Sequence, residues 1–109
     1  MDATQRGGPW WLYRALGTVF STLMLITEIK QTSDAFPSQW EGRLADGRPF
    51  YIRYRGGYLM VRFGPVGGSF DDALNTDNWF DQKVGADLDE KIELVEVCRL
   101  TGLALPSLD

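Results

Sequence analysis

The chain has 109 residues, 44% of them hydrophobic and 24% charged, a composition that is typical of one ordinary globular domain and excludes a disordered tail or a fibrous protein. It contains no histidine and one cysteine, Cys98, so its own residues cannot form a structural zinc site, an intramolecular disulfide, a Ser-His-Asp triad or a Cys-His pair. The net charge of −4 is unevenly distributed, because residues 1–70 carry eight Lys and Arg against five Asp and Glu, whereas residues 71–109 carry three against ten.

The first 23 residues are an apolar and aromatic extension. Pro9 favours the first turn of a helix over residues 9–23, although β-branched residues in the same stretch also fit a strand. The uncharged stretch from Ala15 to Thr27 has 13 residues, fewer than the about 20 that a transmembrane helix needs, so we expect no membrane span. Strand-forming residues follow Met24, which is an alternative start, and residues 24–109 are expected to form a single α+β domain.

A secretory signal is a second interpretation of this extension. Arg6 and Arg14 precede the apolar run, and Ser33-Asp34-Ala35 has the small-x-small pattern of a cleavage site. Glu28 and Lys30 place charges in a segment that is neutral in such signals. We therefore expect a cytoplasmic protein.

Residues 39–63 have the pattern of three antiparallel strands. Gly56-Gly57 predicts a two-residue hairpin loop, because both glycines can adopt the positive φ that a primed turn requires. This loop places Arg55 opposite Tyr58 and Phe50 opposite Phe63. The apolar pattern supports that register, since one face of the sheet then carries Phe50, Ile52, Tyr54, Leu59, Val61 and Phe63.

The preceding turn contains Asp46 and Gly47. A two-residue loop would place Arg43 opposite Phe50 on the apolar face, so parity favours a three-residue loop, Asp46-Gly47-Arg48. This loop puts Leu44 opposite Phe50. The remaining predicted pairs are Arg43 with Tyr51, Glu41 with Arg53, and Trp40 with Tyr54.

The other face of this sheet, which we call the second face, is polar and mostly basic. Arginines interleaved with tyrosines suit single-stranded nucleic acid, because the rings stack on bases and the guanidinium groups hold phosphates. Two further interpretations stay open: an ordinary solvated face, and a docking surface for the acidic C-terminal helix. The candidate nucleic-acid-binding residues are Arg43, Tyr51, Arg53, Arg55, Tyr58 and Arg62.

A turn-rich linker after Phe63 leads into an acidic stretch, residues 70–85. Ser69 and Asp72 have the spacing of a capping box, which predicts a short helix over residues 70–74. The aspartates of this stretch lack the alternating spacing and the distal glutamate of an EF-hand loop, so we predict no metal site.

The C-terminal part predicts the clearest helix of the chain, beginning at Asp87 and ending before Gly102. An apolar stripe at helical spacing indicates that this helix covers the sheet: Leu88, Ile92, Val95 and Cys98. Cys98 is interpreted as a small buried residue of this stripe and not as a nucleophile, because only Arg99 is near it in sequence to activate it.

These patterns favour an α+β fold, a small antiparallel β-meander of three to four strands packed by a C-terminal α-helix. No spacing brings two carboxylates together and no glycine-rich loop cradles a phosphate, so we expect no catalytic residues, no enzyme activity and no cofactor. The favoured hypothesis is a small acidic protein-binding module, for example a phage or mobile-element inhibitor whose carboxylates imitate phosphates in the groove of a nucleic-acid-handling protein.

The predicted protein-binding residues are Asp71, Asp72, Asp77, Asp81, Glu90, Glu93 and Glu96. The alternative hypothesis is a single-stranded nucleic-acid-binding protein that uses the second face. The sequence fixes neither the identity of a partner nor the oligomeric state.

Overall fold

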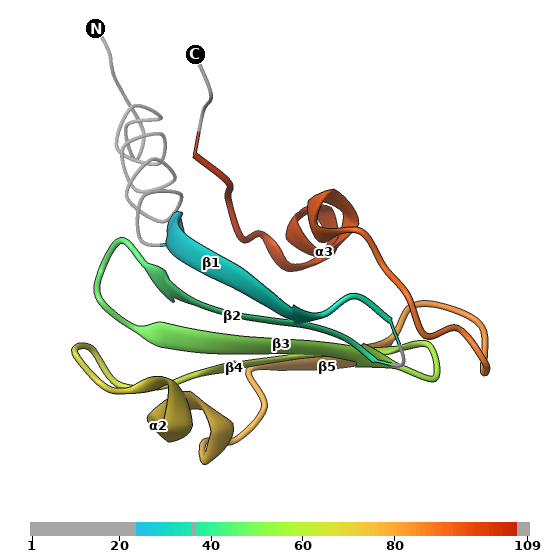
Figure 1. The fold of residues 1–109 in the computed structure, drawn as a ribbon, viewed down its shortest axis with the longest axis horizontal. Helices are drawn as coiled ribbons and strands as arrows, with labels where there is room; N and C mark the ends of the chain where they lie inside the picture. The colour runs from blue at the N-terminus through green and yellow to red at the C-terminus, as the bar shows by residue number, and fades with distance from the viewer. Residues whose placement is uncertain (1–23, 36, 107–109) are drawn as a thin grey trace, which may run out of the picture.

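A computed structural model describes residues 24–35 and 37–106 of the chain. The predicted N-terminal helix lies outside these residues. The elements, in chain order, are β1 (Ile26–Ser33), β2 (Ser38–Leu44), β3 (Pro49–Arg55), β4 (Tyr58–Phe63), α2 (Phe70–Leu74), β5 (Phe80–Lys83) and α3 (Leu94–Thr101) (Figure 1).

The strands form one antiparallel sheet in the order β1-β2-β3-β4-β5, which confirms the predicted α+β class with an antiparallel meander. The prediction of three to four strands was too low, because β5 pairs with β4 from Tyr58↔Lys83 to Val61↔Phe80. β5 has four residues and all but Phe80 are exposed. It therefore lacks the alternation of apolar and polar residues by which a half-buried strand is recognised.

The hairpin between β3 and β4 has the predicted register over all six pairs, from Phe50↔Phe63 to Arg55↔Tyr58. Gly56 and Gly57 both have positive φ, 58° and 81°, as a primed two-residue turn requires. The predicted apolar face is confirmed for Ile52 and Val61, which are fully buried.

The predicted register between β2 and β3 is wrong by two residues. Gly42, not Leu44, lies opposite Phe50, and the backbone N–H of Leu44 donates to the carbonyl of Arg48 at 2.9 Å. Parity could not detect this error, because a shift of two residues keeps every side chain on its face. Glycine is required at position 42, since a Cβ there would lie 2.4 Å from Cζ of Phe50.

This correction changes the predicted charge pair on the second face. Glu41 lies opposite Tyr51, whereas Gln39 lies opposite Arg53. The predicted cross-strand contact between Glu41 and Arg53 is therefore not formed.

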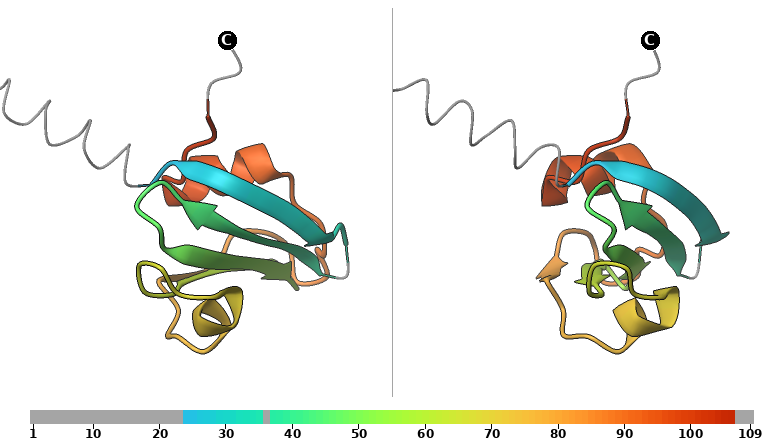
Figure 2. Two further views of the ribbon diagram at one scale, coloured as in Figure 1. Left: turned by 60° about the vertical axis from the view of Figure 1, so that its left-hand side comes forward. Right: turned by 90° about the vertical axis from the view of Figure 1, so that its left-hand side faces the viewer.

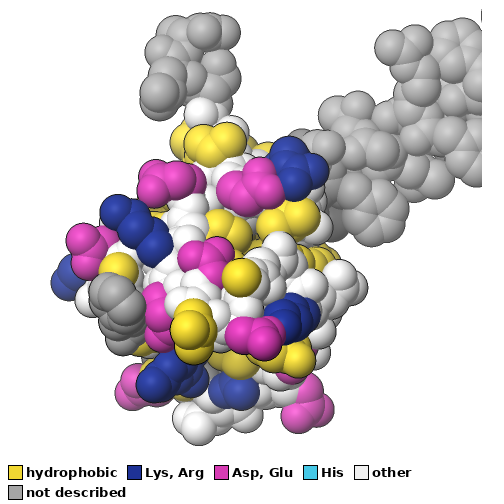
Figure 3. All heavy atoms as spheres, turned by 90° about the vertical axis from the view of Figure 1, so that its right-hand side faces the viewer, with side chains coloured by type: hydrophobic (Ala, Val, Ile, Leu, Met, Phe, Trp, Pro, Cys, Tyr) yellow, Lys and Arg dark blue, Asp and Glu magenta, His cyan; other side chains and the backbone are white. Residues whose placement is uncertain are grey.

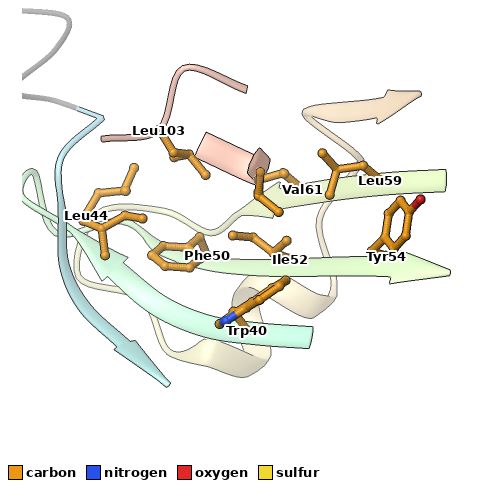
Figure 4. Packing of buried hydrophobic residues seen from close by; sticks show 10 residues of the cluster. Trp40, Leu44, Phe50, Ile52, Tyr54, Leu59, Val61 and Leu103 are labelled. Atoms are coloured by element: carbon orange, nitrogen blue, oxygen red, sulfur yellow. The ribbon is translucent and has the colours of Figure 1, made fainter. Parts of the chain in front are cut away.

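The apolar face of the sheet carries the hydrophobic core, and α3 with the segment that follows it covers this face (Figure 4). Val97 of α3 is fully buried against the sheet, and Leu103 is 3% exposed. Cys98 is partly buried and packs against the core, as the sequence predicted. The residues of the core cluster are Ile26, Trp40, Leu44, Phe50, Ile52, Tyr54, Leu59, Val61, Val97 and Leu103.

The C-terminal helix is shorter than predicted, because it begins at Leu94 and not at Asp87. It ends as predicted at Gly102, which has a left-handed φ of 85°. Leu88 and Val95, which were assigned to the apolar stripe, are 91% and 71% exposed.

Residues 84–93, which we call the clasp segment, bond to one end of the sheet instead of forming the first turns of the helix. The backbone N–H of Gly57 donates to Asp89 at 2.9 Å, and the Tyr54 hydroxyl donates to the Asp89 carboxylate at 2.5 Å. The backbone N–H of Ile92 donates to the buried Ser38 hydroxyl at 3.2 Å. These tertiary hydrogen bonds explain why the helical pattern starting at Asp87 is overridden.

α2 and α3 lie on opposite sides of the sheet (Figures 1 and 2). The predicted capping box of α2 is confirmed: the Ser69 hydroxyl accepts from the Asp72 N–H at 3.2 Å, and the Asp72 carboxylate accepts from the Ser69 N–H at 2.8 Å. α2 contacts β3 and β4. α3, which carries one Glu and one Arg, therefore does not cover the second face, whereas the shorter α2 covers part of it.

Candidate binding site

The second face of the sheet is organised in cross-strand rows. One row runs from Lys30 through Glu41 and Tyr51 to Arg62. The next two rows hold three more predicted nucleic-acid-binding residues and lead to β5: Gln39, Arg53, Met60 and Asp81 in one, and Arg55, Tyr58 and Lys83 in the other. The sheet thus brings five of the six candidate residues into three neighbouring rows, whereas Arg43 lies opposite Pro49 in another row.

Arg43 forms hydrogen bonds with two loops, one containing Gly47 and one containing Gly68. One of its terminal nitrogens donates to the carbonyls of Gly47 and Gly68, both at 3.0 Å. Its guanidinium also lies 5.5 Å from the centre of the Phe70 ring at the start of α2. These contacts use Arg43 to hold two loops together.

Arg62 is tied to the loop after α2 in the same way. Its Nε donates to the Asn78 side-chain oxygen at 2.7 Å, and a terminal nitrogen donates to the carbonyl of Leu74 at 2.7 Å. Arg43 and Arg62 form what we call the anchored half of the second face.

Tyr51 stands at the border of the anchored half. Its hydroxyl donates to the Gln39 side-chain oxygen at 3.1 Å. Burial raises the pKa of Tyr51, with Arg53 and Arg62 acting in the opposite direction. Its partly buried ring packs on the sheet and is less available for stacking than an exposed tyrosine.

Arg53, Arg55, Tyr58 and Met60 form what we call the open patch. Together with Asp81 they line a shallow pocket of about 220 Å³. The Tyr58 side chain is 53% exposed and stands between Arg55 and Lys83 in its row. The patch therefore offers one accessible aromatic ring beside two guanidinium groups.

Arg53 is the least satisfied polar side chain of this patch. Its Nε is buried, and no acceptor among residues 24–35 and 37–106 forms a hydrogen bond with it. Arg53 also forms no ion pair with a described residue. Leaving a buried donor unpaired costs about 1 to 3 kcal/mol. Because the Nε itself is out of reach of solvent, an incoming anionic acceptor contacts the part of the Arg53 guanidinium that lines the pocket.

Arg55 is only loosely held. Its Nε lies 3.7 Å from Oε1 of Glu90, and its side chain is 62% exposed. The other oxygen of Glu90 accepts a hydrogen bond from the backbone N–H of Gly56, so this carboxylate is committed to the hairpin turn. If Arg55 turns toward a ligand, the carboxylate of Glu90, whose side chain is 19% exposed, keeps the backbone N–H of Gly56 as a hydrogen-bond donor.

The acidic residues predicted to bind a protein partner lie on both sides of the sheet. Asp71 and Asp72 are on α2, whereas Glu93 and Glu96 are at the start of α3 on the other side (Figure 2). Several of these carboxylates have partners within the chain: Asp72 caps α2, Glu90 binds the hairpin turn, Asp81 accepts from Asn78 at 3.0 Å, and Glu96 pairs with Arg99 at 2.5 Å. Asp77 is exposed in the loop after α2.

The hydrogen bond from Arg99 lowers the pKa of the Glu96 carboxyl. In the view of Figure 3, acidic and basic side chains are interspersed and no patch of one sign dominates. The structure thus places the seven acids as separate groups, and their joint binding of a partner stays a prediction.

Other chemistry is sparse in the described part of the chain. Burial raises the pKa of the Cys98 thiol, which lowers its reactivity. Residues 24–35 and 37–106 contain no group of three or more His, Cys, Asp or Glu side chains arranged to hold a metal ion. None of the helices described in that range is long and apolar enough to cross a membrane.

Comparisons of the chain with family models, with curated proteins and with solved structures gave no match. The functional argument therefore rests on the geometry of the chain itself.

Sequence reasoning placed Met60 on the second face, but it missed the role of β5, which adds Asp81 and Lys83 to the same face. It also missed that Arg43 and Arg62 bond to loop carbonyls. The turn-rich sequence of those loops was visible, but which carbonyls meet which arginine is set by tertiary packing.

Proposed function

We propose that this protein is a non-enzymatic binding module that holds single-stranded nucleic acid on the open patch. The observation that carries the proposal is the pocket lined by Arg53, Arg55 and Tyr58, in which neither arginine side chain donates a hydrogen bond to a described residue. This proposal takes up the alternative of the two hypotheses from the sequence. It keeps three of the six predicted residues, Arg53, Arg55 and Tyr58, and adds Met60.

The chemistry of the patch fits the two parts of a nucleotide. A phosphate oxygen accepts from Arg53 and from Arg55, while a base stacks on the exposed ring of Tyr58. Met60 lies beside Arg53 on β4 and extends the apolar floor. Duplex DNA fits less well, because none of the described elements projects from the open patch to enter a groove.

The protein-binding hypothesis has less geometric support than the open patch. Its acidic residues are divided between the α2 side and the α3 side of the sheet, so one flat partner surface cannot contact them all. Three of the seven carboxylates are exposed and have no side-chain partner among the described residues: Asp71 and Asp77 near α2, and Glu93 at the start of α3.

The proposal is tested by titrating labelled single-stranded DNA and RNA of about 12 nucleotides with the full chain, at salt concentrations from about 50 to about 200 mM. We expect salt-dependent binding. Arg53→Ala and Arg55→Ala should each reduce the slope of log affinity against log salt by about 0.7, the value for one phosphate contact on a single strand.

Arg99→Ala is the matched control, because it removes the same charge from an exposed position on α3, on the other side of the sheet. It should leave the slope unchanged. Absence of binding at the lowest salt would overturn the proposal. Equal binding of a polyglutamate peptide, unaffected by Tyr58→Ala, would identify the patch as a site for acidic peptides instead.

A further inference from the structure

The outer edge of β1 is open along most of its length. β1 lies at one end of the strand order, and among the described strands it pairs with β2 alone. The segment after α3 covers its start, where the Ile26 N–H donates to the carbonyl of Ala104 at 2.8 Å. From residue 27 to residue 33, no described backbone group bonds to the outer edge. Free edges of this kind add a further strand readily.

The side chains of this edge strand are exposed on both faces. All six residues from Thr27 to Thr32 are exposed, including Ile29, which is 37% exposed although it lies on the side of the hydrophobic core opposite Gly42. The register with β2 is interrupted between Ile26 and Glu28 and again between Gln31 and Ser33. Between these two bulges, residues 28–31 form a regular strand with an open edge.

Symmetry limits how this edge can pair with a copy of itself. An antiparallel pair related by a twofold axis keeps each face on its own side, so one residue must lie opposite its own copy. Centring on Gln31 would pair Lys30 with Thr32 inside the second bulge, which leaves Glu28, Ile29 and Lys30 as the central choices. Centring on Glu28 or on Lys30 places like charges directly opposite each other, which is destabilising.

Centring on Ile29 removes this conflict. Glu28 of each copy then lies opposite Lys30 of the other, which gives two pairs of opposite charge on the second-face side. The two Ile29 side chains meet on the other side and cover each other's exposed surface. One alternating triplet, Glu28-Ile29-Lys30, thus matches its own copy in one register.

We propose that β1 pairs with β1 of a second copy of this chain, antiparallel and centred on Ile29. The two sheets become continuous, and both open patches then lie on the same side of the joined sheet. A strand pair of this length buries less surface than a standard interface, so the dimer forms at high protein concentration and dissociates on dilution.

Sedimentation velocity of the full chain over a concentration series tests the proposal. We expect a reversible dimer that is weakened about tenfold by Glu28→Lys and about tenfold by Lys30→Glu, because each change makes both charge pairs repulsive. The double variant should dimerise as the unchanged chain does. An equimolar mixture of the two single variants should form a mixed dimer, detected by native mass spectrometry with one variant isotopically labelled.

Matched controls are Glu96→Lys and Arg99→Glu, which change the net charge equally from α3. They should leave dimerisation unchanged. A chain that stays monomeric at the highest concentration, or single variants that dimerise as well as the unchanged chain, would overturn the proposal.

A measurement on the unchanged chain covers the case in which a variant fails to fold, since Glu28 and Lys30 also lie opposite Arg43 and Glu41 within the chain. Backbone amides between residues 27 and 31 should exchange hydrogen more slowly in concentrated than in dilute protein. Exchange that does not depend on concentration would exclude pairing through this edge.

Discussion

The anchored half and the open patch of the second face contain the same residue type but use it differently. Arg43 and Arg62 each donate two hydrogen bonds to groups in the loops around α2, whereas Arg53 and Arg55 donate none to a described residue. The strands position all four side chains on one face, and the chain after β4 covers only two of them. Whether an arginine on this sheet stabilises the fold or can bind a ligand therefore depends on which residues pack over its side chain. Its position in the strand does not determine which of these roles it has.

The largest expected effect is a difference in stability between variants of the anchored half and variants of the open patch. Arg43→Ala removes two charge-assisted hydrogen bonds to the carbonyls of Gly47 and Gly68, and should lower the free energy of unfolding by about 2 to 3 kcal/mol in urea denaturation. Arg55→Ala should lower it by less than about 0.5 kcal/mol, because that side chain is mostly exposed. Equal losses of unfolding free energy in the two variants would contradict the division of the second face into an anchored half and an open patch.

The second expected effect is a pH dependence of stability, which comes from the hydrogen bond between Tyr54 and Asp89 of the clasp segment. Burial, followed by the hydrogen bond to Asp89, raises the pKa of Tyr54 from 10.0 to about 12. The folded state therefore favours the neutral hydroxyl, and its stabilisation is complete below pH 10. It is lost as the pH rises from 10 to about 12, by about 2 kcal/mol.

Tyr54→Phe should remove this part of the pH dependence, although the variant is less stable at neutral pH because Asp89 loses its donor. The measurement is the difference in unfolding free energy between the two proteins at several alkaline pH values. A constant difference across this range would show that Tyr54 does not titrate with unfolding.

Tyr58→Ala should affect binding and spare stability, the reverse of Arg43→Ala. The ring is 53% exposed, so its loss should change the unfolding free energy by less than about 0.5 kcal/mol. Loss of one stacked base should weaken single-stranded DNA binding by about 1 to 3 kcal/mol, measured by fluorescence anisotropy. Tyr58→Phe should retain the affinity. A loss of affinity in Tyr58→Phe as large as in the alanine variant would argue against stacking.

The smallest expected effect concerns the carboxylate of the pocket. Asp81 lines the pocket with Arg53 and repels an incoming phosphate, so Asp81→Asn should raise the affinity for single-stranded DNA about two- to fivefold. Asparagine keeps an oxygen that accepts from Asn78. Asp71→Asn, on α2, is the control and should have no effect. Weaker binding of the Asp81 variant would indicate that the carboxylate contacts the ligand directly.

Local signals in the sequence predicted the local parts of the fold. The Gly56-Gly57 turn and the parity of the flanking residues together fix one register, and Ser69 with Asp72 mark the start of α2. Parity alone could not choose between registers that differ by two residues, so the β2–β3 pairing was misplaced. β5 was not predicted because its sequence has no strand-like alternation of apolar and polar residues, and it is a strand by virtue of its pairing with β4.

The candidate site was predicted only in outline for the same reason. The alternation of Arg53, Arg55 and Tyr58 on one face follows from strand geometry and was predicted correctly as a shared face. The division of that face depends on hydrogen bonds from Arg43 and Arg62 to loop carbonyls distant in sequence. The start of α3 at Leu94 likewise depends on contacts between the clasp segment and Ser38, which no helical pattern contains.

The bridge between Leu25 and Ala104 has a consequence for the order of folding. It joins segments at the two ends of the described chain, and contacts so distant in sequence form late because closing a long loop costs entropy. The pairs of the five-stranded sheet join segments that are closer in sequence, and they can form before the segment after α3 docks. Until Leu103 packs there, part of the apolar face stays exposed, and an exposed apolar sheet face is prone to aggregation.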